Sequence, residues 1–397
     1  MTAAAAPSPA GAPAGASTRV GSLDFVRGVV MILMAIDHVR VYSGVPAGGP
    51  TPGVFFTRWI THFVAPAFVF LAGTAAYLHG RRVGRAALAR FLVTRGAWLV
   101  LLELTVIRVS WTFNVDFAHY LLAGVIWMIG WCMILLALLV YLPTRVIGGF
   151  GVATILGHNL LNYLPAETWK SLGEGPLGWL WSLVYGGGAV ELGPGGPPLI
   201  ILYVLVPWIG VMAAGYAFGL VVQMEPERRR TLCIRLGVAL TVAFVALRAL
   251  NGYGDRNHWS AGAPLSFLAT SKYPASLLFL LMTLGPMLVL LGVAERARGR
   301  IAGAVTVFGR VPFFYYLLHI PLIHLLACLV SLVRTGAVDP WLFANHPMLP
   351  PEVPNGYMWS LPLLYLVWLV AIAILYVACR WYAALKARRR DWWLGYL

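Results

Sequence analysis

Residues 22–43 read SLDFVRGVVMILMAIDHVRVYS, an apolar stretch that carries four charged residues and a histidine. A helix that crosses a membrane needs about 20 predominantly apolar residues, which this stretch supplies. Charged groups at membrane depth are costly, so they mark a function or pair with one another. The stretch therefore predicts an integral membrane protein and indicates where its site lies.

The composition of the whole chain supports a membrane protein. Its 397 residues are 60% hydrophobic and 11% charged, with a mean hydropathy of +0.79. Soluble domains contain about 25% charged residues, so this chain could not cover a water-exposed surface. The net charge of +15 comes from basic residues in short loops, so we predict no nucleic-acid partner. The four cysteines lack metal-site or disulfide spacing, and we predict no metal.

The apolar runs predict an all-α, polytopic membrane fold with about ten transmembrane helices. These helices are expected over residues 23–43, 59–79, 93–110, 120–141, 145–163, 199–222, 232–250, 273–293, 311–333 and 361–382. Residues 1–18 are Ala-, Pro-, Gly- and Ser-rich and are predicted to form a disordered tail. Residues 19–386 would form the transmembrane domain, and residues 387–397 a cytoplasmic C-terminal tail.

The basic residues predict the orientation of the chain. Stretches 81–95, 228–235, 296–310 and 380–390 are rich in arginine and fall on one side if the number of spans is even. The positive-inside rule then places both termini in the cytoplasm, and we expect a multi-pass protein of the cell inner membrane. The opposite loops, such as 164–198 and 334–360, are longer and rich in Gly, Pro and Trp, which is typical of loops that cover a site.

One face of the first span joins its cytoplasmic end to a histidine deep in the membrane. Arg27 and His38 are eleven residues apart, about three helical turns, and Met31 and Met34 lie between them. His62, near the start of the second span, is expected at a similar depth, so the two histidines could meet. Alternatively, each is separately hydrogen-bonded.

The remaining ionisable residues leave several interpretations open. Asp24 with Arg27, and Asp37 with Arg40, have the i, i+3 spacing of helix ion pairs. His319 is expected in the cytoplasmic half of the ninth span, either as a core histidine or as a further site residue. The chain contains no HExxH, GxSxG or P-loop motif, which argues against a metalloprotease, a serine hydrolase and an ATP-driven pump. Histidine chemistry or transport remains.

Several motifs carry a resemblance to a known family. Residues 22–38, together with FVAPAFVFLAG at 63–73, resemble the heparan-α-glucosaminide N-acetyltransferase family. NGYGD at 251–255, SKYPASLLFLLMTLG at 271–285 and FYYLLHIPLIH at 314–324 resemble its bacterial branch of transmembrane acyltransferases. The resemblance implies transfer of acetyl from cytoplasmic acetyl-CoA to an amine or hydroxyl of an extracytoplasmic sugar or glycan. The partners implied are acetyl-CoA, the glycan and the lipid bilayer. A second copy of the chain, in a homodimer, is a further possible partner.

The resemblance and the residues together give a set of candidate site residues. The animal enzyme has its catalytic histidine in the first non-cytoplasmic loop, whereas residues 44–58 contain none, so we assign that role to His38 or His62. The catalytic candidates are His38, His62 and Asp37, with His319 as a further candidate. Those expected to bind CoA are Asp24, Arg27, Arg81, Arg82 and Arg310, with the pantetheine arm along Met31 and Met34. Those expected to bind the acceptor are Arg40, Asp255 and Lys272.

Two functions of other classes stay open on the sequence alone. Buried His, Asp and Arg residues also suit a proton-coupled transporter of a small polar solute. No inverted repeat or matching pair of broken helices is found, which argues against that alternative. A non-catalytic partner in envelope polysaccharide assembly is the third reading.

Overall fold

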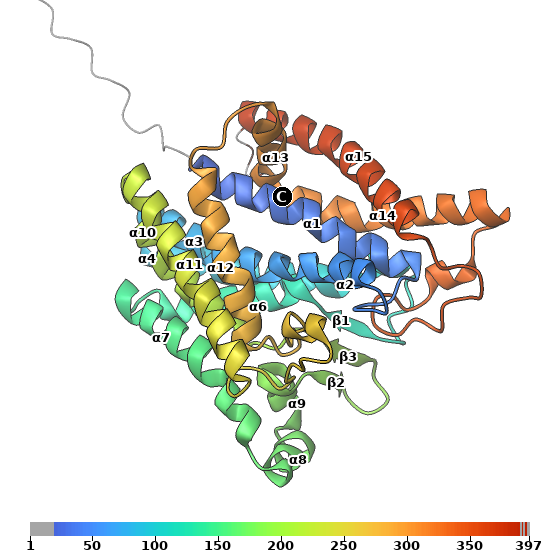
Figure 1. The fold of residues 1–397 in the computed structure, drawn as a ribbon, viewed down its shortest axis with the longest axis horizontal. Helices are drawn as coiled ribbons and strands as arrows, with labels where there is room; N and C mark the ends of the chain where they lie inside the picture. The colour runs from blue at the N-terminus through green and yellow to red at the C-terminus, as the bar shows by residue number, and fades with distance from the viewer. Residues whose placement is uncertain (1–19, 390, 392–393, 395–397) are drawn as a thin grey trace, which may run out of the picture.

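The computed structural model describes residues 20–389, 391 and 394. The tail predicted over residues 1–18 lies outside this range, as does part of the C-terminal tail predicted over 387–397. The described chain is mostly helical, and the helices pack side by side in one body (Figure 1). The division of the chain into domains stays a prediction.

The first helix, α1 (Gly21–Ser43), is the centre of one half of the molecule (Figure 1). It contacts five other long helices: α3 (Val64–Val83), α12 (Leu277–Ala294), α13 (Arg300–Arg310), α14 (Pro312–Thr335) and α15 (Leu361–Arg388). Residues of both ends of the chain therefore surround the stretch that the sequence singled out. The four charges of α1 lie inside this packing and not against lipid alone.

The other half of the molecule is built by helices from the middle of the chain. Here α4 (Arg85–Leu102) packs on α6 (Val125–Leu139), and α11 (Pro226–Leu250) packs on α12. The helix α10 (Trp208–Val222) contacts α3, α6 and α7 (Thr144–Gly157). The short helical segments are α2 (Pro52–Trp59), η1 (Ile60–Phe63), η2 (Glu103–Ile107), α5 (Arg108–Thr112), η3 (His158–Tyr163), α8 (Ala166–Glu174), α9 (Gly178–Trp181), η4 (Ser182–Gly186), η5 (Pro264–Phe267) and η6 (Pro340–Phe343).

Glycines allow the helices to approach closely where they cross. A Cβ atom built on Gly28 of α1 would lie 2.0 Å from the carbonyl oxygen of Val305 in α13. A Cβ on Gly73 of α3 would lie 2.0 Å from the carbonyl oxygen of Met212 in α10. Close backbone contact at small residues is the usual way in which membrane helices associate, because lipid offers no hydrophobic drive between them.

A small sheet is the main departure from the all-α prediction. It has the order β1-β3-β2, with β1 (Leu121–Ala123) parallel to β3 (Pro198–Ile201) and β2 (Gly188–Glu191) antiparallel to it. Two of these strands fall inside predicted spans, and α6 and α10 begin only after them, at Val125 and Trp208. A short apolar run has the same hydropathy in a strand as in a helix, so the sequence pattern could not separate them.

Five helical stretches of the described chain are long and apolar enough to span a membrane. They are Pro52–Val83, Pro226–Leu250, Leu277–Ala294, Pro312–Thr335 and Leu361–Arg388, and two shorter apolar helices are Val125–Leu139 and Trp208–Val222. The charged helix α1 is not among them. A membrane-embedded, multi-pass chain follows from these helices, while the count of ten spans stays a prediction.

Replacing Gly28 with alanine should destabilise the protein, because the new methyl group meets the Val305 carbonyl. We expect Gly28→Ala to lower the free energy of unfolding by about 1–3 kcal/mol, the usual cost of overpacking. Thermal unfolding of the purified protein in detergent measures this. The matched control is Gly149→Ala in α7, where the new Cβ has no neighbour within 4 Å. Equal unfolding temperatures for the two variants would contradict the close contact of α1 and α13.

Candidate active site

Two cavities lie next to each other between α1 and the helices around it. The first, which we call the polar chamber, has a volume of about 180 Å3. Its lining comprises Met34, Asp37, His38, Arg40, Val41, Arg58, Thr61, Val64, Ala65, Phe68, Glu103, Trp111, Leu122, Gly124, Val125, Leu202, Tyr203, Lys272, Tyr273, Tyr316, Pro347 and Met348. Most ionisable residues of the site gather here, from α1, the start of the second apolar stretch and two loops.

The second cavity, the apolar chamber, is larger, at about 420 Å3. Its lining comprises Arg27, Met31, Phe68, Ala72, Ala75, Ala76, His79, Phe91, Leu92, Arg95, Leu99, Val125, Ile126, Ile129, Met133, Pro312, Phe313 and Tyr316. Phe68, Val125 and Tyr316 line both chambers, so these three side chains form the wall between them. The α1 face predicted from the sequence runs past this wall, with Arg27 and Met31 on one side and Met34 and His38 on the other.

His38 contacts His319 at the polar chamber. Nδ1 of His38 lies 2.6 Å from Nε2 of His319, and the rings stack with centroids 4.7 Å apart. His38 is in the last turns of α1, which ends at Ser43 and is followed by Gly44 in a left-handed conformation with φ 73°. His319 is in α14 and is completely buried. Trp111 closes the site edge-on, with its ring centroid 4.9 Å from that of His38.

The hydrogen bonds around His319 determine where the protons of this pair lie. Nδ1 of His319 is 2.6 Å from the carbonyl oxygen of Tyr316, which can only accept, so this nitrogen carries the hydrogen. In a neutral ring Nε2 then has a lone pair, and Nδ1–H of His38 must donate to it. His38 therefore keeps an unprotonated Nε2, which accepts no hydrogen bond from the described residues. A backbone carbonyl thus makes His38 a ready proton acceptor.

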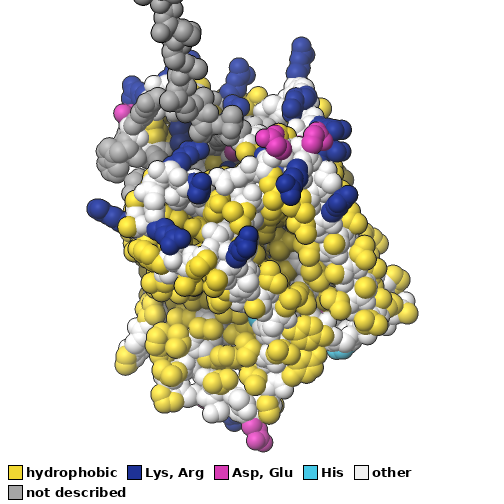
Figure 2. All heavy atoms as spheres, turned by 90° about the vertical axis from the view of Figure 1, so that its left-hand side faces the viewer, with side chains coloured by type: hydrophobic (Ala, Val, Ile, Leu, Met, Phe, Trp, Pro, Cys, Tyr) yellow, Lys and Arg dark blue, Asp and Glu magenta, His cyan; other side chains and the backbone are white. Residues whose placement is uncertain are grey.

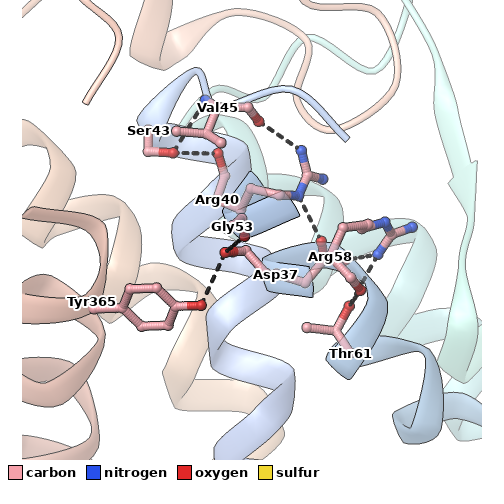
Figure 3. A network of polar contacts seen from close by, with 9 residues as sticks. Asp37, Arg40, Ser43, Val45, Gly53, Arg58, Thr61 and Tyr365 are labelled. Atoms are coloured by element: carbon pink, nitrogen blue, oxygen red, sulfur yellow. Dashed lines mark hydrogen bonds and ion pairs between the residues drawn. The ribbon is translucent and has the colours of Figure 1, made fainter. Parts of the chain in front are cut away.

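Asp37 is held between two arginines, while the hydrogen bond of the His38 ring goes to His319. Nε of Arg40 donates to Oδ1 of Asp37 at 2.9 Å, and Arg58 pairs with the other carboxylate oxygen (Figure 3). Arg40 also donates to the carbonyl oxygen of Val45 at 3.0 Å. Asp37 is a catalytic candidate on the sequence, but the hydrogen bond that orients His38 is the one to His319.

Arg58 is a site residue that the sequence reasoning missed. It lies at the end of the short helix α2, whose first turn is capped by Thr51, since the hydroxyl of Thr51 accepts from the Val54 amide at 3.3 Å. Pro52 at the first position also favours a helix start. This local signal was readable, but the predicted span began only at residue 59. Tyr203, Glu103 and Trp111 also line the polar chamber and lie outside the quoted motifs, whereas Tyr273 lies within the motif at 271–285 but was not singled out.

Lys272 lies in the polar chamber on a loop that Asp255 holds in place. Asp255 accepts hydrogen bonds from the amide and hydroxyl of Ser271, at 2.9 and 2.7 Å, and from the hydroxyl of Ser276, at 2.6 Å. Asp255 itself does not line either chamber. Burial, aided by nearby Arg58, lowers the pKa of Lys272 below its ordinary value. Of the two residues expected to bind the acceptor here, Lys272 faces the chamber and Asp255 positions it.

The depth predicted for His319 needs a correction. The sequence placed His319 in the cytoplasmic half of its span and paired His38, deep in the membrane, with His62, yet the rings of His38 and His319 touch. The reason is α13, a helix in a segment taken for a loop, which packs along the first turns of α1. Because α13 packs beside the first turns of α1, α14 begins farther along α1. The second turn of α14 therefore lies next to His38.

His62 and several arginines lie away from these contacts. His62 packs against Phe279, with centroids 5.4 Å apart, and lines neither chamber. Arg27 pairs with Asp24 at 3.4 Å and faces the apolar chamber, where Arg95 and His79 join it. Arg81, Arg82 and Arg310 are exposed. Figure 2 shows basic side chains gathered across the top of one face, above a mainly apolar surface.

Comparison with known proteins identifies the family. The model of the catalytic domain of heparan-alpha-glucosaminide N-acetyltransferase matches residues 19–253, more than half of the chain. The chain belongs to this family. A search of curated proteins finds no match. The matched region includes His38, His62 and Arg58, whereas Lys272 and His319 lie beyond it. Membership of a family of acetyltransferases makes this chain a transmembrane acetyltransferase.

Asp37→Asn tests whether Asp37 chiefly neutralises Arg40 and Arg58. The amide would leave two cations without a counter-charge, so we expect a loss of stability of about 3 kcal/mol or more. The matched control, Asp116→Asn, alters an exposed pair with His119 and should cost little. Thermal unfolding in detergent measures both. An Asp37→Asn variant as stable as the control would instead point to a role in the reaction itself.

Proposed function

We propose that this acetyltransferase takes acetyl-CoA from the cytoplasmic side and acetylates an amine or hydroxyl of an extracytoplasmic sugar held in the polar chamber. The observation that carries the proposal is the His38–His319 pair in the polar chamber. This chamber is separated from the apolar chamber by a wall that both line. Acyl transfer needs a base for the attacking group, and neutral histidine is suited to it. His38 lines the chamber where the acceptor would lie, and its Nε2 is the unprotonated nitrogen of the ring.

The apolar chamber has the character that the acyl donor requires. Its lining is mainly aliphatic and aromatic, which suits a pantetheine arm, and Met31 is part of it. Arg27 and Arg95 lie in the same lining and supply positive charge for phosphate groups. Arg81, Arg82 and Arg310 are exposed and are assigned to the entry of CoA. The thioester would reach the acceptor at the wall of Phe68, Val125 and Tyr316.

The reaction follows from the proton positions. Nε2 of His38 removes a proton from the acceptor's amine or hydroxyl as that group attacks the thioester carbonyl. The new bond to carbon forms, the carbon–sulfur bond breaks, and the CoA thiolate leaves with the proton from His38. During the step His38 is positively charged, and its Nδ1–H remains bonded to His319. A partner that accepts from Nδ1–H both holds the tautomer and stabilises the imidazolium.

Substitution of the two histidines tests this mechanism. We expect His38→Ala to reduce acetyl transfer by roughly 10²–10⁴-fold, the usual contribution of a general base. His319→Ala should reduce it less, because His38 keeps its ring but loses its orientation, and His319→Gln should recover part of the loss. Membrane vesicles supplied with radiolabelled acetyl-CoA, followed by measurement of labelled glycan, give the rates. Exposed His119→Ala is the control.

His62→Ala distinguishes the two histidine arrangements. A loss as large as that of His38→Ala in a folded protein would return His62 to the reaction. Normal transfer by folded His38→Ala would refute the proposed base. Transport of a sugar without any labelled product would favour the proton-coupled transporter.

The proposed orientation predicts which surfaces an impermeant thiol reagent can reach. With both termini in the cytoplasm, Glu174→Cys in α8 should react in intact cells and Arg300→Cys at the start of α13 should not. Both positions are exposed, so a difference reports the side of the membrane. Three of the four native cysteines, 132, 233 and 379, are buried, and Cys328 is partly buried, so the parent protein without an added cysteine gives the background. The reverse labelling pattern would overturn the orientation.

A further inference from the structure

Lys272 brings an unpaired positive charge to the polar chamber. Arg40 and Arg58 also line it, but they bind the two carboxylate oxygens of Asp37. Within residues 20–389, 391 and 394, Lys272 takes part in no ion pair. Three cations and one shared acid therefore leave a surplus of positive charge on this side of the chamber.

The second acid of the lining does not neutralise Lys272. Oε2 of Glu103 accepts from the amides of Ile126 and Trp127, at 2.9 and 3.3 Å, and so caps the first turn of α6. A Cβ on Gly124 would lie 2.4 Å from the other carboxylate oxygen, so the carboxylate is fixed against that turn. Glu103 serves the helix N-terminus, where a negative charge is stabilised.

Aromatic rings hold the ammonium without removing its charge. Nζ of Lys272 is 5.8 Å from the ring centroid of Tyr203 and 5.2 Å from that of Tyr273. Cation–π contacts of this kind are attractive and use none of the three N–H donors of the ammonium. The hydroxyl of Tyr273 accepts one of these donors, and the others remain for a ligand. The loop is also rigid, because Asp255 bonds to Ser271 on one side of Lys272 and to Ser276 on the other. Lys272 is thus fixed in place before any ligand arrives.

We infer that the polar chamber takes an acidic sugar, and that Lys272 binds its carboxylate or phosphate group while His38 faces the group to be acetylated. A partly buried cation without a counter-ion is disfavoured, and an anion that pairs with it gains charge-assisted hydrogen bonds. The hydroxyls of a neutral sugar can accept from the ammonium, but they bring no counter-charge. The inference rests on the proposed function, since it names the class of acceptor for the same site, and it makes Lys272 a specificity-determining residue.

Matched sugars that differ only in the anion test the inference. Glucose, glucose 6-phosphate and glucuronate are titrated calorimetrically into the full-length protein in detergent free of anionic lipid. We expect at least one anionic sugar to bind roughly tenfold more tightly than glucose, which is about the free energy of one charge-assisted hydrogen bond. The phosphate and carboxylate arms show which acid the site prefers. Equal affinities for all three sugars, or no binding of either acid, would overturn the inference.

Variants at Lys272 test whether this residue causes the preference for acidic sugars. Lys272→Gln should lose the preference, Lys272→Arg should keep it, and the matched control Lys170→Gln, at an exposed lysine in α8, should leave it unchanged. An unchanged preference in Lys272→Gln would overturn the assignment of the anion to Lys272. If Lys272→Gln does not fold, the charge is tested on the wild type, where added salt must weaken binding of the acid but not of glucose.

Failure of this inference is distinguishable from failure of the proposed function. Acetyl transfer from labelled acetyl-CoA to neutral and acidic acceptors is measured on the same preparation. Transfer that is equally fast to both kinds of acceptor keeps the proposed function and removes the acidic-sugar preference. Binding of an acidic sugar through Lys272 without any transfer supports the anion site and removes the acetyltransfer mechanism.

Discussion

The close packing of α13 against the first turns of α1 determines where along α1 the next helix, α14, begins. Gly28 and Gly309 make it possible, because a Cβ on Gly309 would lie 1.8 Å from the carbonyl oxygen of Asp24. Because α13 packs beside the first turns of α1, α14 starts beside the middle of α1. There the Tyr315 hydroxyl donates to the Met31 carbonyl at 2.9 Å. One turn later His319 meets His38. Two glycines thus place the histidine pair.

Most buried charges of this protein have structural partners. The guanidinium of Arg248 donates to the carbonyl oxygens of Phe267, Asn257, Ser266 and Ala269, which joins α11 to the following loop. Arg108 donates to the carbonyl oxygens of Tyr120 and Asp116 in the same way. Arg229 binds Glu295, which also accepts from Ser22 and so ties α11 and α12 to the start of α1. A charge in an apolar segment is costly, and here carbonyls or a carboxylate offset that cost. Lys272 differs from these arginines, because it takes part in no ion pair with the described residues.

The sequence could predict the features that depend on the local spacing of apolar and charged residues. The apolar runs gave most long helices, and the spacing of Arg27, Met31, Met34 and His38 gave one face of α1, whose residues line the two chambers in that order. The pairing of His38 with His319 could not be predicted, since 281 residues separate them and their relative depth depends on α13. The helix α13 itself was hidden in an arginine-rich segment that the topology pattern treats as a loop. Asp255 looked like a binding residue, because the sequence does not show that Ser271 and Ser276 use its oxygens.

The wall between the chambers has a consequence for the proposed chemistry. A thioester that met the water of a polar cavity beside an unprotonated histidine would be hydrolysed, because the base that activates a sugar also activates water. Phe68 and Tyr316 separate the mainly apolar chamber from the one that contains His38, so they keep water from the donor's path. Tyr316 also supplies the carbonyl that fixes the proton on His319. Tyr316 therefore both belongs to the wall and fixes the tautomer of the base, and a shift of α14 at Tyr316 would open the path and disturb the tautomer together.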